Sequence, residues 1–187
     1  MGAAGPPPAV TLRIVSGGQT GADRAALDFA LARRWPHGGW CPHGRRTEAG
    51  VLEARYQLRE TPSAEYRQRT EWNVRDSDGT VIFSLAALLT GGAATTADCA
   101  RRLGKPWLHL TAATPRAAHR LAAFVATHGI KTLNVAGPRA SEEPAIDSFV
   151  RRMLEAAFPV DRAAAAAPAA SRRSPPNPQR RLPANPR

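Results

Sequence analysis

Short apolar runs alternate along the chain with longer stretches whose apolar residues recur at helical spacing. Runs typical of buried strands occur at 10–15, 80–83, 107–110 and 132–135. Stretches with helical spacing occur at 22–34, 64–75, 95–103, 114–128 and after Pro144. This alternation predicts parallel strands joined by right-handed crossovers, with helices on both faces of the sheet. The predicted fold class is therefore α/β, with three layers and a mostly parallel central sheet.

The first predicted strand leads into the first predicted helix through a glycine-rich turn. The candidate ligand contacts in this turn are Gly17, Gly18, Gln19, Thr20 and Gly21. A turn of this kind directs free backbone N–H groups and the positive end of a helix dipole at one spot, which suits a phosphate or another oxyanion. The spacing matches neither the dinucleotide fingerprint nor the P-loop, so a tight turn without a ligand remains the alternative.

Two more turns of this kind precede helices further along the chain. The strand at 80–83 ends at Ser84, and the turn that follows it contains Thr90, Gly91, Gly92 and Thr95. The third turn, 137–141, contains Gly137 and Arg139. In a parallel sheet all strand-to-helix turns lie at the carboxyl edge, where ligands bind. We therefore expect the three turns to converge around one crevice.

The stretch 64–75 carries a polar stripe at helical spacing, which consists of Tyr66, Arg69, Thr70 and Asn73. A stripe of this kind either faces solvent or lines a site. Arg45 and Arg46 place two adjacent guanidinium groups in a polar loop. Cys41 and His43 are two residues apart, but no further ligands follow at a suitable spacing, so no metal site is predicted. His109 is expected to be a hydrogen-bonded histidine at the end of a strand.

Composition and charge set the predicted domain boundaries. Residues 1–9 and 159–187 are rich in Ala and Pro, so the ligand-binding domain is predicted at 10–158, with a flexible N-terminus and a disordered tail. The formal net charge is +11, and residues 161–187 hold six Arg against one Asp. Nucleic-acid binding by this tail ranks last, because no interleaved aromatic residues could stack bases.

The sequence also bears on the compartment. No apolar run approaches the ~18 residues that a membrane-spanning helix needs. The two cysteines form no disulfide framework. A reduced, cytoplasmic setting is therefore expected, with no membrane partner.

Five blocks of the chain together resemble the molybdenum carrier family, the molybdenum-cofactor carrier proteins. The blocks are Ser16–Asp23, Gly39–Pro42, Arg69–Thr80, Thr90–Gly92 and Leu133–Arg139. The resemblance covers residues 12–158. This family is a circularly permuted branch of the Rossmann-like superfamily, which also includes lysine-decarboxylase-like proteins and nucleotide-ligand sensors.

The resemblance implies a Rossmann-like fold with a pocket at the carboxyl edge of the sheet. The ligand it implies is phosphate-bearing or oxyanionic: the molybdenum cofactor (molybdopterin), molybdate or a nucleotide. It also implies a homo-oligomer, with molybdoenzymes as acceptors. The lysine-decarboxylase-like relatives use a Pro-Gly-Gly-x-Gly-Thr turn. The counterpart at 90–95 lacks the leading Pro and the third Gly, which argues against the nucleotide-hydrolysing chemistry of those relatives.

The first functional hypothesis is a binding or carrier protein that is not an enzyme. Backbone N–H groups of the glycine-rich turns would hold the anion, and Arg139 with Arg45 or Arg46 would supply charge, because a guanidinium binds two oxygens at once. The complete set of predicted ligand-binding residues is Gly17, Gly18, Gln19, Thr20, Gly21, Arg45, Arg46, Ser84, Thr90, Gly91, Gly92, Thr95, Gly137 and Arg139.

The second hypothesis is a nucleotide-derived ligand sensor or a hydrolase that processes nucleoside monophosphates. A hydrolase needs a carboxylate at the same edge to assist departure of the base or to activate water. Asp23, Glu48 and Glu71 are the candidates. Asp23 could instead hold the first turn by accepting backbone N–H groups, which is the commoner role for Asp at the start of a helix.

Overall fold

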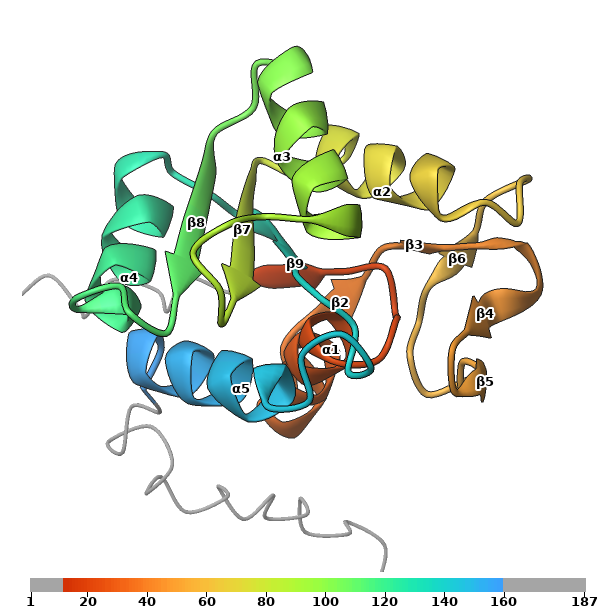
Figure 1. The fold of residues 1–187 in the computed structure, drawn as a ribbon, viewed down its shortest axis with the longest axis horizontal. Helices are drawn as coiled ribbons and strands as arrows, with labels where there is room; N and C mark the ends of the chain where they lie inside the picture. Colours follow the sequence, from red (N-terminus) through yellow and green to blue (C-terminus); the bar gives the residue numbers. More distant parts are fainter. Residues whose placement is uncertain (1–11, 160–187) are drawn as a thin grey trace, which may run out of the picture.

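The computed structural model describes residues 12–159, and its elements follow the predicted alternation of strands and helices (Figure 1). The main sheet contains β1 (Arg13–Val15), β2 (His37–Gly38), β7 (Gly79–Ser84), β8 (Trp107–Thr111) and β9 (Thr132–Ala136). The helices are α1 (Ala22–Ala32), α2 (Tyr66–Arg75), α3 (Gly91–Arg102), α4 (Ala117–Thr127) and α5 (Ile146–Ala157). Except for Pro159, the predicted terminal segments 1–9 and 159–187 lie outside the described residues.

The main sheet is parallel throughout, with strand order β2-β1-β9-β7-β8. The chain moves outward from β1 to β2 in one direction and from β7 to β8 in the other. Because both crossovers are right-handed, α1 and α3 lie on opposite faces of the sheet. Strand β9 fills the position between β1 and β7, where the strand order reverses. In open α/β sheets, ligands bind outside the carboxyl ends of the strands at this reversal.

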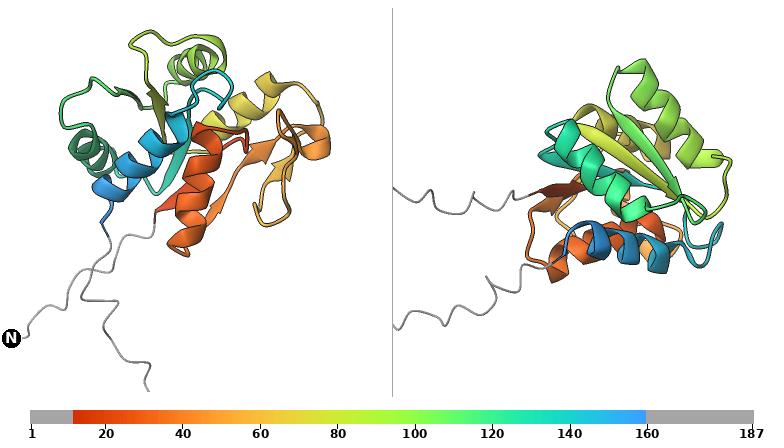
Figure 2. Two further views of the ribbon diagram at one scale, coloured as in Figure 1. Left: turned by 60° about the horizontal axis from the view of Figure 1, so that its bottom comes forward. Right: turned by 90° about the vertical axis from the view of Figure 1, so that its left-hand side faces the viewer.

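Two helical layers enclose the sheet, so the predicted α/β, Rossmann-like three-layer class is confirmed (Figures 1 and 2). Helices α1, α4 and α5 cover one face, and their apolar residues form the main core with Ile14, Phe83 and Leu133. Helices α2 and α3 pack against each other on the other face. Every residue of β7 is buried, as expected for a central strand covered on both sides. None of the described helices combines the length and the apolar character that crossing a membrane requires.

The segment between β2 and α2 forms a small excursion beside the sheet. Strand β3 (Trp40–Cys41) pairs with β6 (Arg59–Glu60), and β4 (Arg46–Thr47) pairs with β5 (Gly50–Val51) after the 3-10 turn η1 (His43–Arg45). A separate apolar cluster holds the excursion against α1, and its buried members are Leu27, Cys41, Leu52, Tyr56 and Leu58.

Two predicted helix starts are wrong for identifiable reasons. Helix α4 begins at Ala117, since Arg116 adopts φ 53° and interrupts the helical path. Helix α3 begins at Gly91, four residues before the predicted start, so the glycines of the second turn belong to its first turn.

Candidate functional site

The first and third glycine-bearing turns are in direct contact at the carboxyl edge. The Ala22 N–H donates to the Pro138 carbonyl at 3.2 Å, and the Ala140 N–H donates to Thr20 Oγ1 at 3.2 Å. A Cβ on Gly21 would lie within 2.9 Å of backbone atoms of residues 138–140. A Cβ on Gly137 would lie 2.5 Å from the Phe83 carbonyl oxygen, so the third turn also touches the end of β7. These contacts require glycine, because there is no room for a side chain.

Within the first turn, three backbone N–H groups already have protein partners. The Gln19 N–H donates to Asp23 Oδ2 at 3.2 Å, the Thr20 N–H donates to Gln19 Oε1 at 3.0 Å, and the Ala22 N–H is bound to Pro138. The Gln19 side chain is buried, and its Nε2 has no hydrogen-bond partner within the described part of the chain. The predicted anion-binding turn at 17–21 therefore has few backbone N–H groups left for a ligand.

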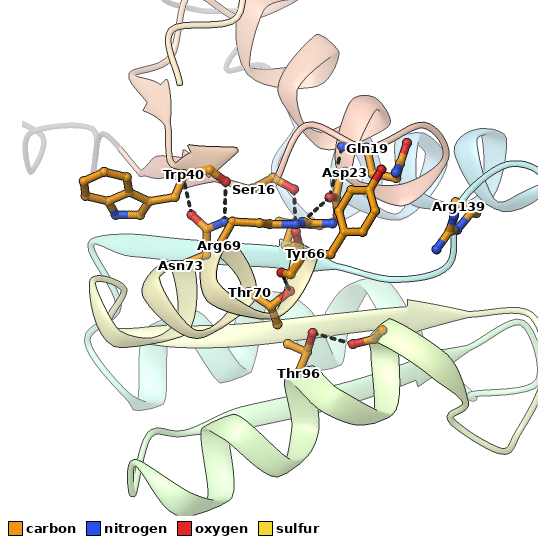
Figure 3. Close-up of polar contacts among 12 residues, drawn as sticks. Ser16, Gln19, Asp23, Trp40, Tyr66, Arg69, Thr70, Asn73, Thr96 and Arg139 are labelled. Carbon is orange, nitrogen blue, oxygen red and sulfur yellow. Dashed lines mark hydrogen bonds and ion pairs between the residues drawn. The ribbon is translucent and has the colours of Figure 1, made fainter. Parts of the chain in front are cut away.

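The close approach at Gly17 is made by a side chain of this protein. The guanidinium of Arg69, on α2, rests on the bare Cα of Gly17, where an added Cβ would lie 1.3 Å from Nη1. Nη1 donates to Asp23 Oδ2 at 2.7 Å, and the side chains of Arg69 and Asp23 are only 14% and 5% exposed. Figure 3 shows Arg69 reaching from α2 to Asp23, with Tyr66 beside it. Asp23 therefore holds the first turn and an arginine together.

The polar stripe of α2 lines a site instead of facing solvent as a whole. Arg69, Thr70 and Asn73 border a cavity of about 10 Å³, together with Gly17, Asp23, Thr96 and Asn134 and backbone of β9. This volume corresponds to roughly one water. The spacing of the stripe is compatible with solvent or a site, and Arg69 is not among the predicted binding residues. The signal was the run of polar residues at the positions where a helix normally packs.

The N-terminus of α3 contrasts with that of α1. Its N-cap residue, Thr90, has extended backbone and makes no capping hydrogen bond with its side chain. Gly91 and Gly92 are exposed, and no atom lies within 4 Å of where a Cβ on Gly92 would be. The Thr95 and Thr96 hydroxyls donate back to the carbonyls of Gly91 and Gly92. The first N–H groups of a helix have no intrahelical acceptors, so this end offers donors to a ligand.

A groove of about 350 Å³ runs between α2 and α3 from this N-terminus. Its lining from α2 is Tyr66, Arg67, Thr70 and Glu71, and its lining from α3 is Gly92, Thr95, Asp98, Cys99 and Arg102. Glu71 pairs with Arg102 at 3.3 Å, and Asp98 pairs with Arg101 at 2.6 Å. Arg67 has no carboxylate within 4 Å among the described residues, so it is a free positive charge in this lining.

Arg139 lies at the rim of the crevice in a charged network. Its Nε is 3.2 Å from Glu142 and 3.9 Å from Glu48, and its guanidinium lies 5.8 Å from the centre of the Tyr66 ring. Burial disfavours the charged form of Glu48, but hydrogen bonds from Ser141 and Thr20 and the charge of Arg139 outweigh it and lower the Glu48 pKa. Glu48 is therefore ionised at neutral pH, where it cannot donate a proton. Its hydrogen bonds link the first turn to the third.

Arg45, Arg46 and Ser84 lie away from any open donor position. The Arg45 guanidinium donates to four backbone carbonyls of residues 52–58 and so fastens the excursion internally. Arg46 is exposed on β4, beside Gly44. Ser84 is 2% exposed, and its hydroxyl lies 2.6 Å from the Ala86 carbonyl and 2.7 Å from His109 Nε2.

His109 is a partly buried, hydrogen-bonded histidine in the middle of β8, which is an edge strand of the sheet, and not at a strand end as predicted. Burial lowers its pKa, and the charge of Glu143 opposes this only in part. Glu143 in turn accepts the Leu85 N–H at 2.6 Å. The Ser84–His109 contact thus fixes the chain that leads toward α3. Within residues 12–159 no group of three or more His, Cys, Asp or Glu side chains could hold a metal ion.

The parallel sheet, the strand reversal and the two helical layers together define an α/β protein of the Rossmann-like class. The chain belongs to the circularly permutated YpsA SLOG family, whose family model matches residues 14–158. It is similar to the crystal structure of a proposed molybdenum carrier protein from Syntrophus aciditrophicus SB, with 44% sequence identity and a TM-score of 0.76. That similarity covers 80% of this chain and 96% of the other. No curated protein sequence matches the chain.

Proposed function

We propose that this protein binds a phosphate-bearing or oxyanionic ligand in the crevice at the carboxyl edge, as a carrier and not as an enzyme. The observation that carries the proposal is the open N-terminus of α3 at the mouth of the α2–α3 groove. Exposed Gly91 and Gly92 leave its first N–H groups accessible, and Thr95 and Arg67 line the groove beside it. Arg139 pairs with Glu142, whose Oε1 lies 3.9 Å from the position of a Cβ on Gly91. Backbone donors and a helix dipole at a groove mouth favour an anion.

The ligand we propose is the molybdenum cofactor or molybdate. The support is the family membership and the description of the Syntrophus aciditrophicus protein as a proposed molybdenum carrier. The groove of about 350 Å³ lies within the size range of small-molecule sites. Delivery to molybdoenzymes, assembly into a homo-oligomer and a cytoplasmic location extend the same proposal.

Replacing Gly92 by Asp tests the site with little risk to the fold. A Cβ at this position meets no atom within 4 Å, and a carboxylate in the first turn of α3 stabilises the helix through its dipole. The same carboxylate would repel an anionic ligand. We expect calorimetric binding of molybdate or molybdenum cofactor to fall at least tenfold, which corresponds to about 1.4 kcal/mol.

Gly92→Asn is the matched control, because it adds nearly the same volume without the charge, and it should retain more affinity than Gly92→Asp. Equal affinity of the Asp variant and the unmodified chain would exclude the α3 N-terminus as the anion site. Absence of binding by the folded, unmodified chain to molybdate, molybdenum cofactor and AMP alike would end the carrier proposal.

The hydrolase alternative now depends on Glu71. Asp23 is bound by Arg69 and the Gln19 N–H, and Glu48 ties two turns together, whereas Glu71 lines the groove itself. Incubation with AMP and detection of free base tests this reaction. Turnover that disappears in Glu71→Gln would favour a nucleoside-monophosphate hydrolase over a carrier.

A further inference from the structure

Arg69 is a largely buried cation whose hydrogen-bonding capacity is mostly unused. A guanidinium carries five N–H donors, and within residues 12–159 those of Arg69 form one side-chain hydrogen bond, from Nη1 to Asp23. Its Nε is buried without any partner among these residues. Leaving a buried donor of a charged group unsatisfied is unfavourable, because the group loses its hydrogen bonds to water. The protein therefore holds a cation at this position at a cost in stability.

The polar neighbours of Arg69 do not explain this arrangement, because their own groups have other partners. The Asn73 amide is bound at both ends to the backbone of Trp40. The hydroxyls of Thr70 and Thr96 donate to carbonyls within their own helices, and Asn134 donates to Thr80. Figure 3 shows Thr70 and Asn73 on α2 with Arg69, and Thr96 on the neighbouring helix α3.

The buried cation is adjacent to the groove of the proposed function. Thr70 lines both the cavity beside Arg69 and the α2–α3 groove, so the two spaces meet at this residue. Tyr66, in the groove lining, has the guanidinium groups of both Arg69 and Arg139 5.8 Å from its ring centre. Two cations thus lie near one aromatic ring of the groove lining.

We propose that Arg69 is an anion-binding residue of this site, which donates its unpaired N–H groups to one oxygen of a tetrahedral oxyanion bound in the adjacent groove. The cavity beside Arg69, with a volume of about 10 Å³, has room for one oxygen of the anion. Asp23 and Gly17 are positioning residues: the carboxylate fixes Nη1, and the missing side chain at 17 gives the guanidinium its place. A phosphate group and molybdate both offer such an oxygen, and a hydrogen bond between two charged groups is stronger than one between neutral groups. This inference rests on the proposed function and adds the buried contact to it.

Two variants separate the Arg69 contact from the fold. Arg69→Lys keeps the charge but loses the guanidinium N–H groups, so we expect inorganic phosphate, molybdate and AMP to bind about tenfold to a hundredfold more weakly. Gly17→Ala removes no donor. Gly17 is not in the left-handed region, and the three atoms nearest to an added Cβ all belong to the flexible Arg69 side chain. The methyl group should therefore displace the guanidinium, and affinity should fall at least about tenfold.

Arg120→Gln, on the exposed surface of α4, is the control for loss of a positive charge elsewhere. Its affinity should equal that of the unmodified chain. The probes also distinguish the sources of the oxyanion. Losses for all three probes assign the contact to any tetrahedral oxyanion. A loss confined to AMP or to molybdate assigns it to that ligand.

Nitrogen-15 NMR reports on the contact without relying on affinity. The Nε–H signal of Arg69, assigned by its absence in Arg69→Lys, should shift when the anion saturates the protein. An unchanged signal means that a water satisfies Nε, and this outcome overturns the inference.

The inference and the proposed function fail in different ways. If the unmodified chain binds anions, Gly92→Asp abolishes binding, and Arg69→Lys and Gly17→Ala bind normally, the carrier site stands and the role of Arg69 is wrong. If the folded, unmodified chain binds none of the probes, both are wrong.

Discussion

Two glycine-bearing helix starts follow strands of the same parallel sheet, and they differ in what their glycines do. In the closed turn, residues 16–22 before α1, glycines let the protein pack against itself: Arg69 lies on Gly17, and residues 138–140 lie against Gly21. In the open turn, residues 90–93 at the start of α3, neither Gly91 nor Gly92 has an atom within 3.5 Å of its missing Cβ. A glycine-rich turn therefore indicates close approach, but the partner can be a ligand or the protein itself.

A similar contrast holds between the ion pair beside the closed turn and an ion pair further along α3. Arg69 and Asp23 lie 2.7 Å apart and are largely buried, whereas Arg101 and Asp98 lie 2.6 Å apart on α3 and are 56% and 71% exposed. From the distances alone, the two ion pairs would be expected to contribute equally to stability. Solvent screening and the cost of stranding a buried charge make them unequal.

The largest effect should come from breaking these pairs. Asp23→Ala leaves the Arg69 cation buried and unpaired and removes the acceptor of the Gln19 N–H, so the free energy of unfolding should fall by about 3–5 kcal/mol. Asp98→Ala should lower it by no more than about 1 kcal/mol, because its pair is exposed. Urea unfolding of both variants measures the difference. Equal losses would mean that the closed turn is no more tightly held than the surface of α3.

A second comparison concerns two glycines with positive φ. Gly21, at φ 74° and ψ −127°, lies within 2.9 Å of backbone atoms that cannot yield, so Gly21→Ala should destabilise the fold by about 3 kcal/mol or more. A Cβ on Gly91, at φ 52°, would meet only Glu142 Oε1, at 3.9 Å. Gly91→Ala should therefore lower the free energy of unfolding only by the roughly 1–2 kcal/mol that a left-handed backbone costs a residue with a side chain. Thermal unfolding distinguishes the two. A larger loss at Gly91 would reverse the assignment of closed and open turns.

Much of the fold could be predicted because hydrophobic periodicity is a local property. The all-buried run at 80–83 identified a central strand, and three turns before helices placed the crevice at one edge of a parallel sheet. Family membership followed from short blocks of sequence within the folded core and is confirmed. The misplaced start of α3 arose because the helix begins with two glycines, which local preference does not favour in a helix.

The site could be predicted only in part, because the roles of its residues depend on distant neighbours. Nothing near Gly17 in the sequence indicates that Arg69 occupies its free face, since the contact joins residues 52 positions apart. Arg45 has the residue type of an anion ligand, yet four carbonyls of the excursion use its donors. The polar stripe on α2 was the one local signal for Arg69, and periodicity could not decide which way it faced.

The smallest effect is a pH dependence that should separate the two turns. Burial lowers the pKa of His109, which holds Ser84 at the start of the chain into the open turn. As pH falls below the ordinary histidine pKa of about 6.5, the unfolded chain takes up a proton before folded His109 does, so this stabilising contribution is lost with acidification. Glu48, which holds the closed turn, has a lowered pKa, so its contribution is present above about pH 4.3 and is lost only in stronger acid.

Amide hydrogen exchange, corrected for intrinsic rates, should therefore show residues 85–90 losing protection between pH 6.5 and 5 while residues 17–22 keep theirs. His109→Gln retains a hydrogen-bonding group toward Ser84 but cannot titrate, so the pH dependence at 85–90 should disappear in this variant. Parallel loss of protection in both segments would show that they open as one cooperative unit. The two turns would then differ in their contacts but not in their local stability. Only ligand binding would distinguish the open turn from the closed one.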